Sequence, residues 1–175
     1  MIETLYKGHA DRVLRYAQRR VPAHDAEEVV AQTFLVAWRP AHDIPQDDPL
    51  PWLFGIARNV IRNLQRSDRR QTRLAARIAT LRSEGDEARE QQELPDELRD
   101  ALASLSPDDR EVLLLIAWDE LDQTQAAAAM GWSKTNFRLR LHRARKRLRQ
   151  RLSNSNHPFP RSSLTNTTPA REEAR

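Results

Sequence analysis

The chain has 175 residues, of which 39% are hydrophobic, so it is long enough for one ordinary domain or two small ones with modest cores. It contains no cysteine, which excludes disulfides, thiol catalysis and cysteine-ligated zinc. The net charge is +4, but the charge is placed unevenly, which favours a polyanionic partner at particular surfaces.

Few residues favour the turns of a β-sheet protein. The chain has only four glycines, and its prolines are confined to a few short stretches, so we expect an all-α fold. No stretch approaches the apolar length of a membrane span, and residues 1–12 are too polar for a signal peptide. We therefore expect a cytoplasmic protein.

Two amphipathic helices are predicted at the start of the chain. Residues 2–21 place apolar side chains at helical intervals until Pro22 interrupts them. A second helix is predicted over 26–38, and Asp25 with Glu28 has the spacing of a capping box at its start. We expect this second helix to bury Val30, Phe34, Ala37 and Trp38.

A third helix is predicted to begin near Pro51, after the irregular and acidic loop 39–49. Beside its apolar stripe lies a polar, basic side that carries Arg58, Asn59, Arg62, Asn63, Gln65, Arg66 and Arg69. Such a side is either a solvated face or a nucleic-acid surface. Trp52 and Phe54 beside the arginines suit stacking on unpaired bases, and they suit the core equally well.

Residues 82–100 are strongly acidic, with eight Asp or Glu residues against three Arg residues. Apolar side chains show no helical or strand periodicity across 83–93. We therefore expect 71–95 to be a flexible linker between two small helical domains. A second helical unit is predicted to begin near Pro95. Within it, Ser106 is placed to cap a helix that has Pro107 in its first position.

The C-terminal unit ends in a helix-turn-helix pattern. A short helix over 124–130 is followed by Gly131, which suits a tight turn, and by Ser133, which suits an N-cap. The helix over 134–151 contains nine basic residues and no acid. Its packing stripe consists of Phe137, Leu141, Ala144, Leu148 and Leu152. The opposite face carries Thr135, Leu139, His142, Arg143 and Lys146, with Arg138 and Arg149 beside it.

This order of helices is the one that places a recognition helix in the DNA major groove. A membrane-surface helix or a calmodulin-binding helix stays an alternative on these residues alone. No catalytic or metal-binding pattern appears, because the five histidines are scattered and there is no Gly-rich phosphate loop. We expect neither an enzyme nor a bound metal or cofactor. Residues 153–175 are rich in Ser, Asn, Thr and Pro, which predicts a disordered tail.

Four segments carry a family resemblance: DAEEVVAQTFLVAW at 25–38, PWLFGIARNVIRNLQR at 51–66, LSPDDREVLLL at 105–115 and MGWSKTNFRLRLHRARKRLR at 130–149. Together they are similar to the extracytoplasmic-function (ECF) sigma factors of bacteria, in the same order along the chain. The last segment is the most specific, since the family's run RLHRARKRL stands here unbroken.

The resemblance implies a sigma region 2 over 1–70 and a sigma region 4 over 96–152, which bind core RNA polymerase and direct it to promoters. Region 2 is then expected to dock on the clamp helices of the β′ subunit through Asp25, Glu28 and Gln32, and region 4 to meet the β flap. The resemblance also implies that a flipped base of the −10 element is captured by loop 39–49. The −10 element itself would be read by Trp52, Arg58, Asn59, Arg62, Asn63 and Arg66.

The −35 duplex, by the same resemblance, is read by Lys134, Thr135, Arg138, Leu139, His142, Arg143 and Lys146. Leu139 stands where the family usually has a small polar residue, and it suits contact with a thymine methyl group. Gln125 and Ala126 stand where the family prefers Glu and Ile, which thins the packing under the turn. The sequence leaves open whether an anti-sigma factor binds.

The alternative from another class is a helix-turn-helix regulator that binds a palindrome as a dimer and is not a polymerase subunit. The arginine- and asparagine-rich helix after Trp52 argues against it, because a ligand-binding or dimerisation module has no use for such a helix.

Overall fold

The computed structural model describes residues 2–39, 44–76 and 94–155. Over these residues the secondary structure is helical, without a strand, as the composition predicts. Seven helices are present in the described ranges: α1 (Ile2–Gln18), α2 (Ala23–Ala37), α3 (Leu50–Ala76), α4 (Asp96–Ala103), α5 (Pro107–Ala117), α6 (Gln123–Met130) and α7 (Lys134–Ser155). The predicted tail, apart from its first three residues, and most of the predicted linker lie outside the described residues.

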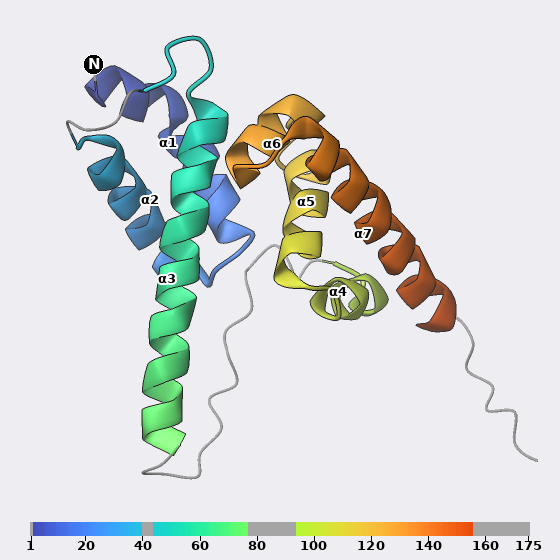
Figure 1. Cartoon of the computed structure of the whole chain (residues 1–175). Coiled ribbons are helices and arrows are strands. Elements are labelled where there is room, and N and C mark those ends of the chain that lie inside the picture. The colour runs from blue at the N-terminus through green and yellow to red at the C-terminus, as the bar shows by residue number, and fades with distance from the viewer. Residues whose placement is uncertain (1, 40–43, 77–93, 156–175) are drawn as a thin grey trace, which may run out of the picture.

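The N-terminal half is a three-helix unit in which α1 and α2 pack on one side of α3 (Figure 1). Its core is built from the apolar stripes of the three helices, and the ring of Tyr16 stacks on that of Phe54 with centroids 4.5 Å apart. Phe54 is therefore a core residue and not a platform for a nucleic-acid base. Since Tyr16 and Phe54 are both fully buried, this stack fixes α1 against α3.

The start and end of α2 differ from the sequence prediction. The N-cap is Pro22, without a side-chain hydrogen bond, so the predicted capping box of Asp25 and Glu28 is wrong. The reason is that Ala23 and His24 already continue the helix, which leaves Asp25 in the first turn, where its charge favours the helix N-terminus. Trp38 follows the last buried position and is 67% exposed, so its predicted burial is also wrong.

Helix α3 is longer than its apolar stripe predicts. It has 27 residues, a length of about 40 Å at 1.5 Å per residue. Its last turns run through 71–76, so the first residues of the predicted linker are helical. Only the first half of α3 packs against other helices, and the remainder projects from the body of the molecule (Figure 1).

The C-terminal half is built by α4, α5, α6 and α7. Ser106 caps α5 as predicted, accepting a hydrogen bond from the backbone N–H of Asp109 at 3.2 Å, with Pro107 in the first turn. Helix α7 packs along α5 through Phe137, Leu141 and Ala144, all of which are buried, and this confirms the predicted stripe. The two halves meet where α6 lies against α3.

Gly131 gives a prediction about the turn between α6 and α7. Its φ is +67°, in the left-handed region, so Gly131→Ala should lower the free energy of unfolding by about 1–2 kcal/mol. Gly8, an exposed glycine inside α1, is the matched control, because Gly8→Ala should raise the free energy of unfolding by about 0.5–1 kcal/mol. Urea unfolding of both variants measures the two signs, and equal signs would contradict the argument.

Candidate nucleic-acid and polymerase interface

The turn before α7 is stabilised by backbone and side-chain caps on both sides. Asp122 accepts hydrogen bonds from the N–H groups of Thr124 and Gln125 at 2.6 and 2.9 Å, and the Gln125 side chain accepts one from the Asp122 N–H at 3.0 Å. This is a capping box that the sequence analysis did not predict, and its signal in the sequence is Asp122 followed three residues later by Gln125. The hydrogen bonds lower the pKa of Asp122 below its ordinary value.

The end of α6 and the start of α7 are equally well defined. The N–H groups of Gly131 and Trp132 donate to the carbonyls of Ala128 and Ala127, which is a Schellman ending. Ser133 then accepts a hydrogen bond from the Asn136 N–H at 3.2 Å, so it caps α7 as predicted. The guanidinium of Arg140 lies 4.7 Å from the centroid of the Trp132 ring and ties the turn to the helix. The direction of α7 therefore follows from the turn itself.

Helix α7 presents one continuous exposed face. Each of the seven residues predicted to read duplex DNA lies on it: Lys134, Thr135, Arg138, Leu139, His142, Arg143 and Lys146. Leu139 is 48% exposed, although it is apolar. The structure thus brings all of these side chains together on the side away from the packing stripe. That these side chains contact DNA stays a prediction.

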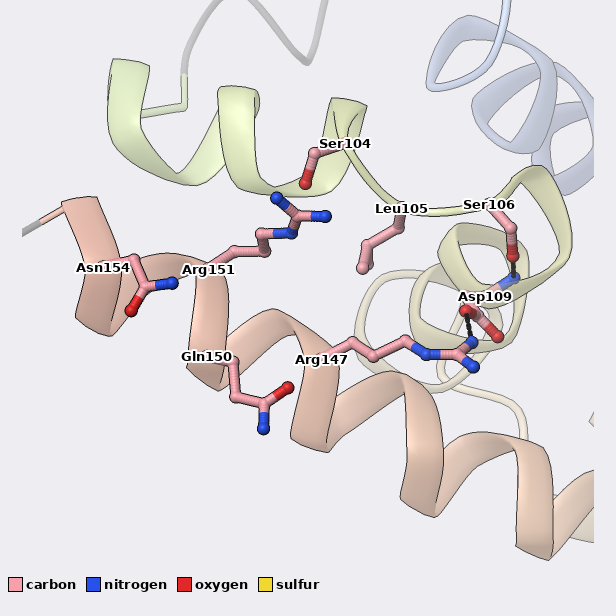
Figure 2. Close-up of a pocket in the computed structure, with 8 residues that line it drawn as sticks. All are labelled: Ser104, Leu105, Ser106, Asp109, Arg147, Gln150, Arg151 and Asn154. Atoms are coloured by element: carbon pink, nitrogen blue, oxygen red, sulfur yellow. Dashed lines mark hydrogen bonds and ion pairs between the residues drawn. The ribbon is translucent and has the colours of Figure 1, made fainter.

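The C-terminal part of α7 is held to α5 by charge. Arg147 forms an ion pair with Asp109, whose carboxylate is buried, and the pair lines a polar pocket of about 590 Å³ (Figure 2). Figure 2 shows Ser104 from the end of α4 on one side of the pocket and Gln150 from α7 on the other, while the side chain of Arg151 extends from α7 towards Ser104. Arg147 is therefore engaged within the protein, although its side chain is 55% exposed, and it is not among the seven residues predicted to read duplex DNA.

The predicted −10 residues on α3 fall into two environments. Asn59, Arg62, Asn63 and Arg66 are exposed along one side of the helix, where a strand of DNA could reach them. Trp52 is half-buried and packs against the core. The side chain of Arg58 is only 14% exposed, and its Nη2 donates to Asp108 of α5 at 2.8 Å. The structure therefore places Arg58 in an ion pair between the two halves.

The predicted polymerase residues lie along one side of α2. Glu28 and Gln32 are exposed, and the Gln32 amide donates to the Glu28 carboxylate at 2.8 Å. Asp25 is partly exposed, one turn before Glu28, so the three side chains form a single polar row.

An apolar groove of about 600 Å³ lies between α1 and α2, and the sequence analysis missed it. Its exposed apolar side chains are Tyr6, Leu35 and Trp38. The groove is rimmed by Glu3, Asp11 and Glu27. Leu35 and Trp38 lie off the buried stripe of α2, and this was the signal in the sequence that could have revealed the groove.

A cluster of charges joins the two halves, and the helical patterns gave no sign of it. Arg20 donates through Nε to Glu111 at 2.9 Å and through Nη2 to Asp119 at 2.6 Å. The Tyr16 hydroxyl donates to Glu111 at 2.6 Å, and Arg19 reaches Asp119 at 3.1 Å. The exposed fractions are 6% for the Arg20 side chain and 1% for the Asp119 side chain.

Burial and charge together fix the protonation states in this cluster. Burial raises the pKa of Tyr16 well above its ordinary value, and the neighbouring Glu111 carboxylate raises it further, so the phenol stays neutral. Burial alone would lower the pKa of Arg20, but Glu111, Tyr16 and Asp119 outweigh it, and the pKa of Arg20 lies above its ordinary value. Arg20 therefore stays charged in the buried site.

The described ranges contain no group of three or more His, Cys, Asp or Glu residues that could hold a metal ion. Among the helices of the described part of the chain, none is long and apolar enough to cross a membrane.

Comparison with known proteins assigns both halves. Residues 5–71 match the family model of sigma-70 region 2, and residues 96–148 match that of sigma-70 region 4. The ECF sigma factor SigL of Mycobacterium tuberculosis is 32% identical over 162 residues, which cover 85% of this chain and 87% of SigL. The sigma factor CnrH of Cupriavidus metallidurans is 34% identical over 140 residues, which cover 73% of each chain.

Solved structures agree with these matches. The structure of CnrH in complex with the cytosolic domain of CnrY superposes with a TM-score of 0.60 at 28% identity, covering 87% of this chain and 88% of CnrH. The sigma factor RpoE of Bartonella quintana, solved with the anti-sigma factor NepR, has the same fold, with a TM-score of 0.61 at 23% identity and coverage of 86% and 96%. The chain therefore belongs to the extracytoplasmic-function group of the sigma-70 family, whose members bind core RNA polymerase and direct it to specific promoters.

Proposed function

We propose that α7 reads the −35 duplex, that the exposed side of α3 reads the −10 element, and that α2 docks on the β′ clamp helices. The observation that carries this proposal is the one-sided burial of α7, which leaves seven predicted DNA-reading residues on a single exposed face. The capped turn before α7 holds that face in one orientation, which supports docking of the helix in a major groove.

The chemistry of the exposed face of α7 suits base-edge readout. Arg138 and Arg143 can each donate two hydrogen bonds to one guanine, and Leu139 can contact a thymine methyl group. Lys146, nearer the C-terminus, suits a phosphate. The face carries no Asp or Glu, so a DNA backbone meets no repulsion along it.

The exposed side of α3 suits an unpaired strand. Asn59 and Asn63 are one turn apart, and so are Arg62 and Arg66, so amide and guanidinium groups alternate along the helix. Amides hydrogen-bond the edges of splayed bases, and arginines hold the backbone. Trp52 lies in the first turn of α3, and we assign the capture of the flipped base to Trp52 and loop 39–49.

The α1–α2 region supports a polymerase contact of mixed character. The polar row of Asp25, Glu28 and Gln32 offers acids to a basic partner, and the adjacent groove with Tyr6 and Trp38 offers apolar area. A buried apolar centre with a polar rim is typical of protein interfaces. We assign the β flap contact to the C-terminal half.

We assign the domains as region 2 over 1–70, a linker over 71–95 and region 4 over 96–152, with a tail over 153–175. We infer that the chain acts without catalysis of its own, in the cytoplasm, where RNA polymerase works. The regulator that acts as a dimer without polymerase is disfavoured, because the N-terminal half matches a polymerase-binding region. Since CnrH was solved with CnrY, we also propose that this chain has an anti-sigma partner.

The first prediction separates base contacts from backbone contacts in α7. Arg143→Ala should weaken initiation selectively on promoters with the matching −35 base, by about 1–3 kcal/mol, while leaving polymerase binding intact. Arg149→Ala should weaken all promoters alike and reduce the salt dependence by about one unit of slope. Run-off transcription with core polymerase on a set of −35 variants measures both. An equal loss on every variant would make Arg143 a backbone contact.

The second prediction concerns the polymerase contact. Replacing Asp25 and Glu28 with Lys should abolish pull-down of core polymerase, because the acidic row would become basic. The control reverses two exposed acids elsewhere, Asp68 on α3 and Glu97 on α4, and should retain pull-down. If the Asp25 and Glu28 variant is helical and still binds, the contact lies elsewhere.

The third prediction concerns the boundary between the domains. Limited proteolysis of the free chain should cut first within 71–95, because residues 83–93 have no apolar periodicity with which to pack against the helices. A denaturing gel should then show two resistant fragments. A single resistant fragment spanning 1–150 would contradict the division.

A further inference from the structure

We propose that the cavity between α3 and α5 binds a small phosphorylated metabolite, whose phosphate group is held by Arg62 and Arg110. The cavity has a volume of about 410 Å³, which lies in the size range of small-molecule sites. It is lined by residues of α1, α3 and α5, the end of α4 and the α4–α5 connection. The proposal goes beyond the proposed function, and its test needs neither polymerase nor promoter DNA.

Positive charge exceeds negative charge in this cavity. Its charged lining consists of four arginines and two acids, Arg20, Arg58, Arg62, Arg110, Asp108 and Glu111. The excess, four minus two, is therefore two positive charges. Glu111 is bound by Arg20 and by the Tyr16 hydroxyl, and Asp108 accepts a hydrogen bond from Arg58. Both carboxylates are thus paired with groups other than Arg62 and Arg110.

Arg110 is half-buried, and no carboxylate of the described residues forms an ion pair with it. Its Nε donates to the carbonyl of Leu102 at 3.0 Å and its Nη2 to that of Ala103 at 2.9 Å, at the C-terminal end of α4. Its Nη1 takes part in neither bond. Burial lowers the pKa of Arg110 below its ordinary value, because it disfavours the charged form. An anion in the cavity would offset this cost.

Arg62 supplies a second guanidinium from the other half of the molecule. Its side chain is exposed one turn after Arg58, and the described ranges offer it no ion-pair partner. Gln65, which is also exposed and lines the cavity, adds an amide donor from the same helix. Arginine binds phosphate with pairs of parallel hydrogen bonds. A phosphate between α3 and α5 would therefore be held from both sides.

The remaining wall of the cavity is apolar. Ile61, Leu105 and Leu114 line it, and the first two belong to the hydrophobic cluster that spans both halves. An apolar wall with a few convergent polar groups is typical of small-molecule sites. An inorganic ion would leave this wall without a contact, whereas the organic part of a phosphate monoester can pack on it.

Charge also favours a monoester over the DNA backbone, which is the other source of phosphate groups near Arg62. A phosphate monoester carries a charge of about −1.5 to −2 at neutral pH, which matches the excess of two positive charges. Each phosphate of a DNA strand is a diester with one negative charge. We therefore assign the cavity to a free monoester.

The first test is isothermal titration of the free, full-length chain with AMP as the probe. Adenosine lacks the phosphate and inorganic phosphate lacks the organic part, so AMP should bind more tightly than either. Arg62→Gln changes an exposed side chain, so the fold should persist, and it should weaken AMP binding by about tenfold or more. The matched control, Arg145→Gln, removes the same charge from an exposed position of α7 outside the cavity and should leave AMP binding unchanged.

The second test uses Arg110 and thermal unfolding. Arg110→Lys keeps the charge but loses the planar fork, so it should weaken AMP binding as well. AMP should raise the unfolding midpoint of the natural chain and of Arg145→Gln, because the ligand binds the folded state. It should raise that of Arg62→Gln and Arg110→Lys much less. This comparison is made within each variant, so a lower starting stability does not obscure it.

Three results would overturn the site. The first is the absence of binding at millimolar AMP, and the second is AMP binding no tighter than inorganic phosphate. The third is equal weakening by Arg62→Gln and Arg145→Gln, which would show attraction to net positive charge alone. If an oligothymidine without terminal phosphates binds in place of AMP and loses affinity in Arg110→Lys, the phosphate comes from the DNA backbone and the metabolite proposal fails. None of these results bears on promoter recognition, which run-off transcription tests separately.

Discussion

The arrangement of the molecule depends on one guanidinium group. Arg20 follows α1 in the chain, yet its two carboxylate partners lie in and after α5, more than ninety positions further along. Because the Arg20 guanidinium is buried, its charge must be matched by the two carboxylates. These hydrogen bonds fix the position of α5 relative to α1. Helices α6 and α7 pack on α5, so their positions relative to α1 depend on that of α5. The mutual orientation of the two surfaces proposed to read the promoter is therefore set by these polar contacts together with the packing of α6 on α3.

The apolar packing serves a different purpose within each half. In α7 the buried row of Phe137, Leu141 and Ala144 uses one side of the helix and leaves the other side for arginines, histidine and an exposed leucine. In α3 the first half packs on one side and leaves Asn59, Arg62 and Asn63 exposed on the other, while the end of the helix projects from the body of the molecule. The buried residues of the two halves form one continuous hydrophobic cluster, while each half keeps its own exposed surface and matches a separate sigma region.

Local patterns predicted the helices, the turn at Gly131 and the caps at Ser106 and Ser133, because these features depend on residues within one or two turns. The local patterns failed where a residue distant in the sequence determines whether a side chain is buried or paired. Trp38 has the apolar character of a core residue, but Ala37 already fills the inward position. Arg58 fits the basic side of α3, but Asp108, fifty positions away, pairs with it. The cluster around Arg20 is invisible to periodicity, because its members are scattered charges that only the packing of helices brings together.

Gln125 joins the local and the tertiary levels in one side chain. Its carbonyl oxygen closes the capping box at the start of α6, while its amide nitrogen donates to Asp48 in the other half. A glutamate at this position would keep the box but set two carboxylates against each other across the junction. A single exchange of amide for acid at position 125 would thus weaken the junction between the two halves and leave the exposed face of α7 unchanged.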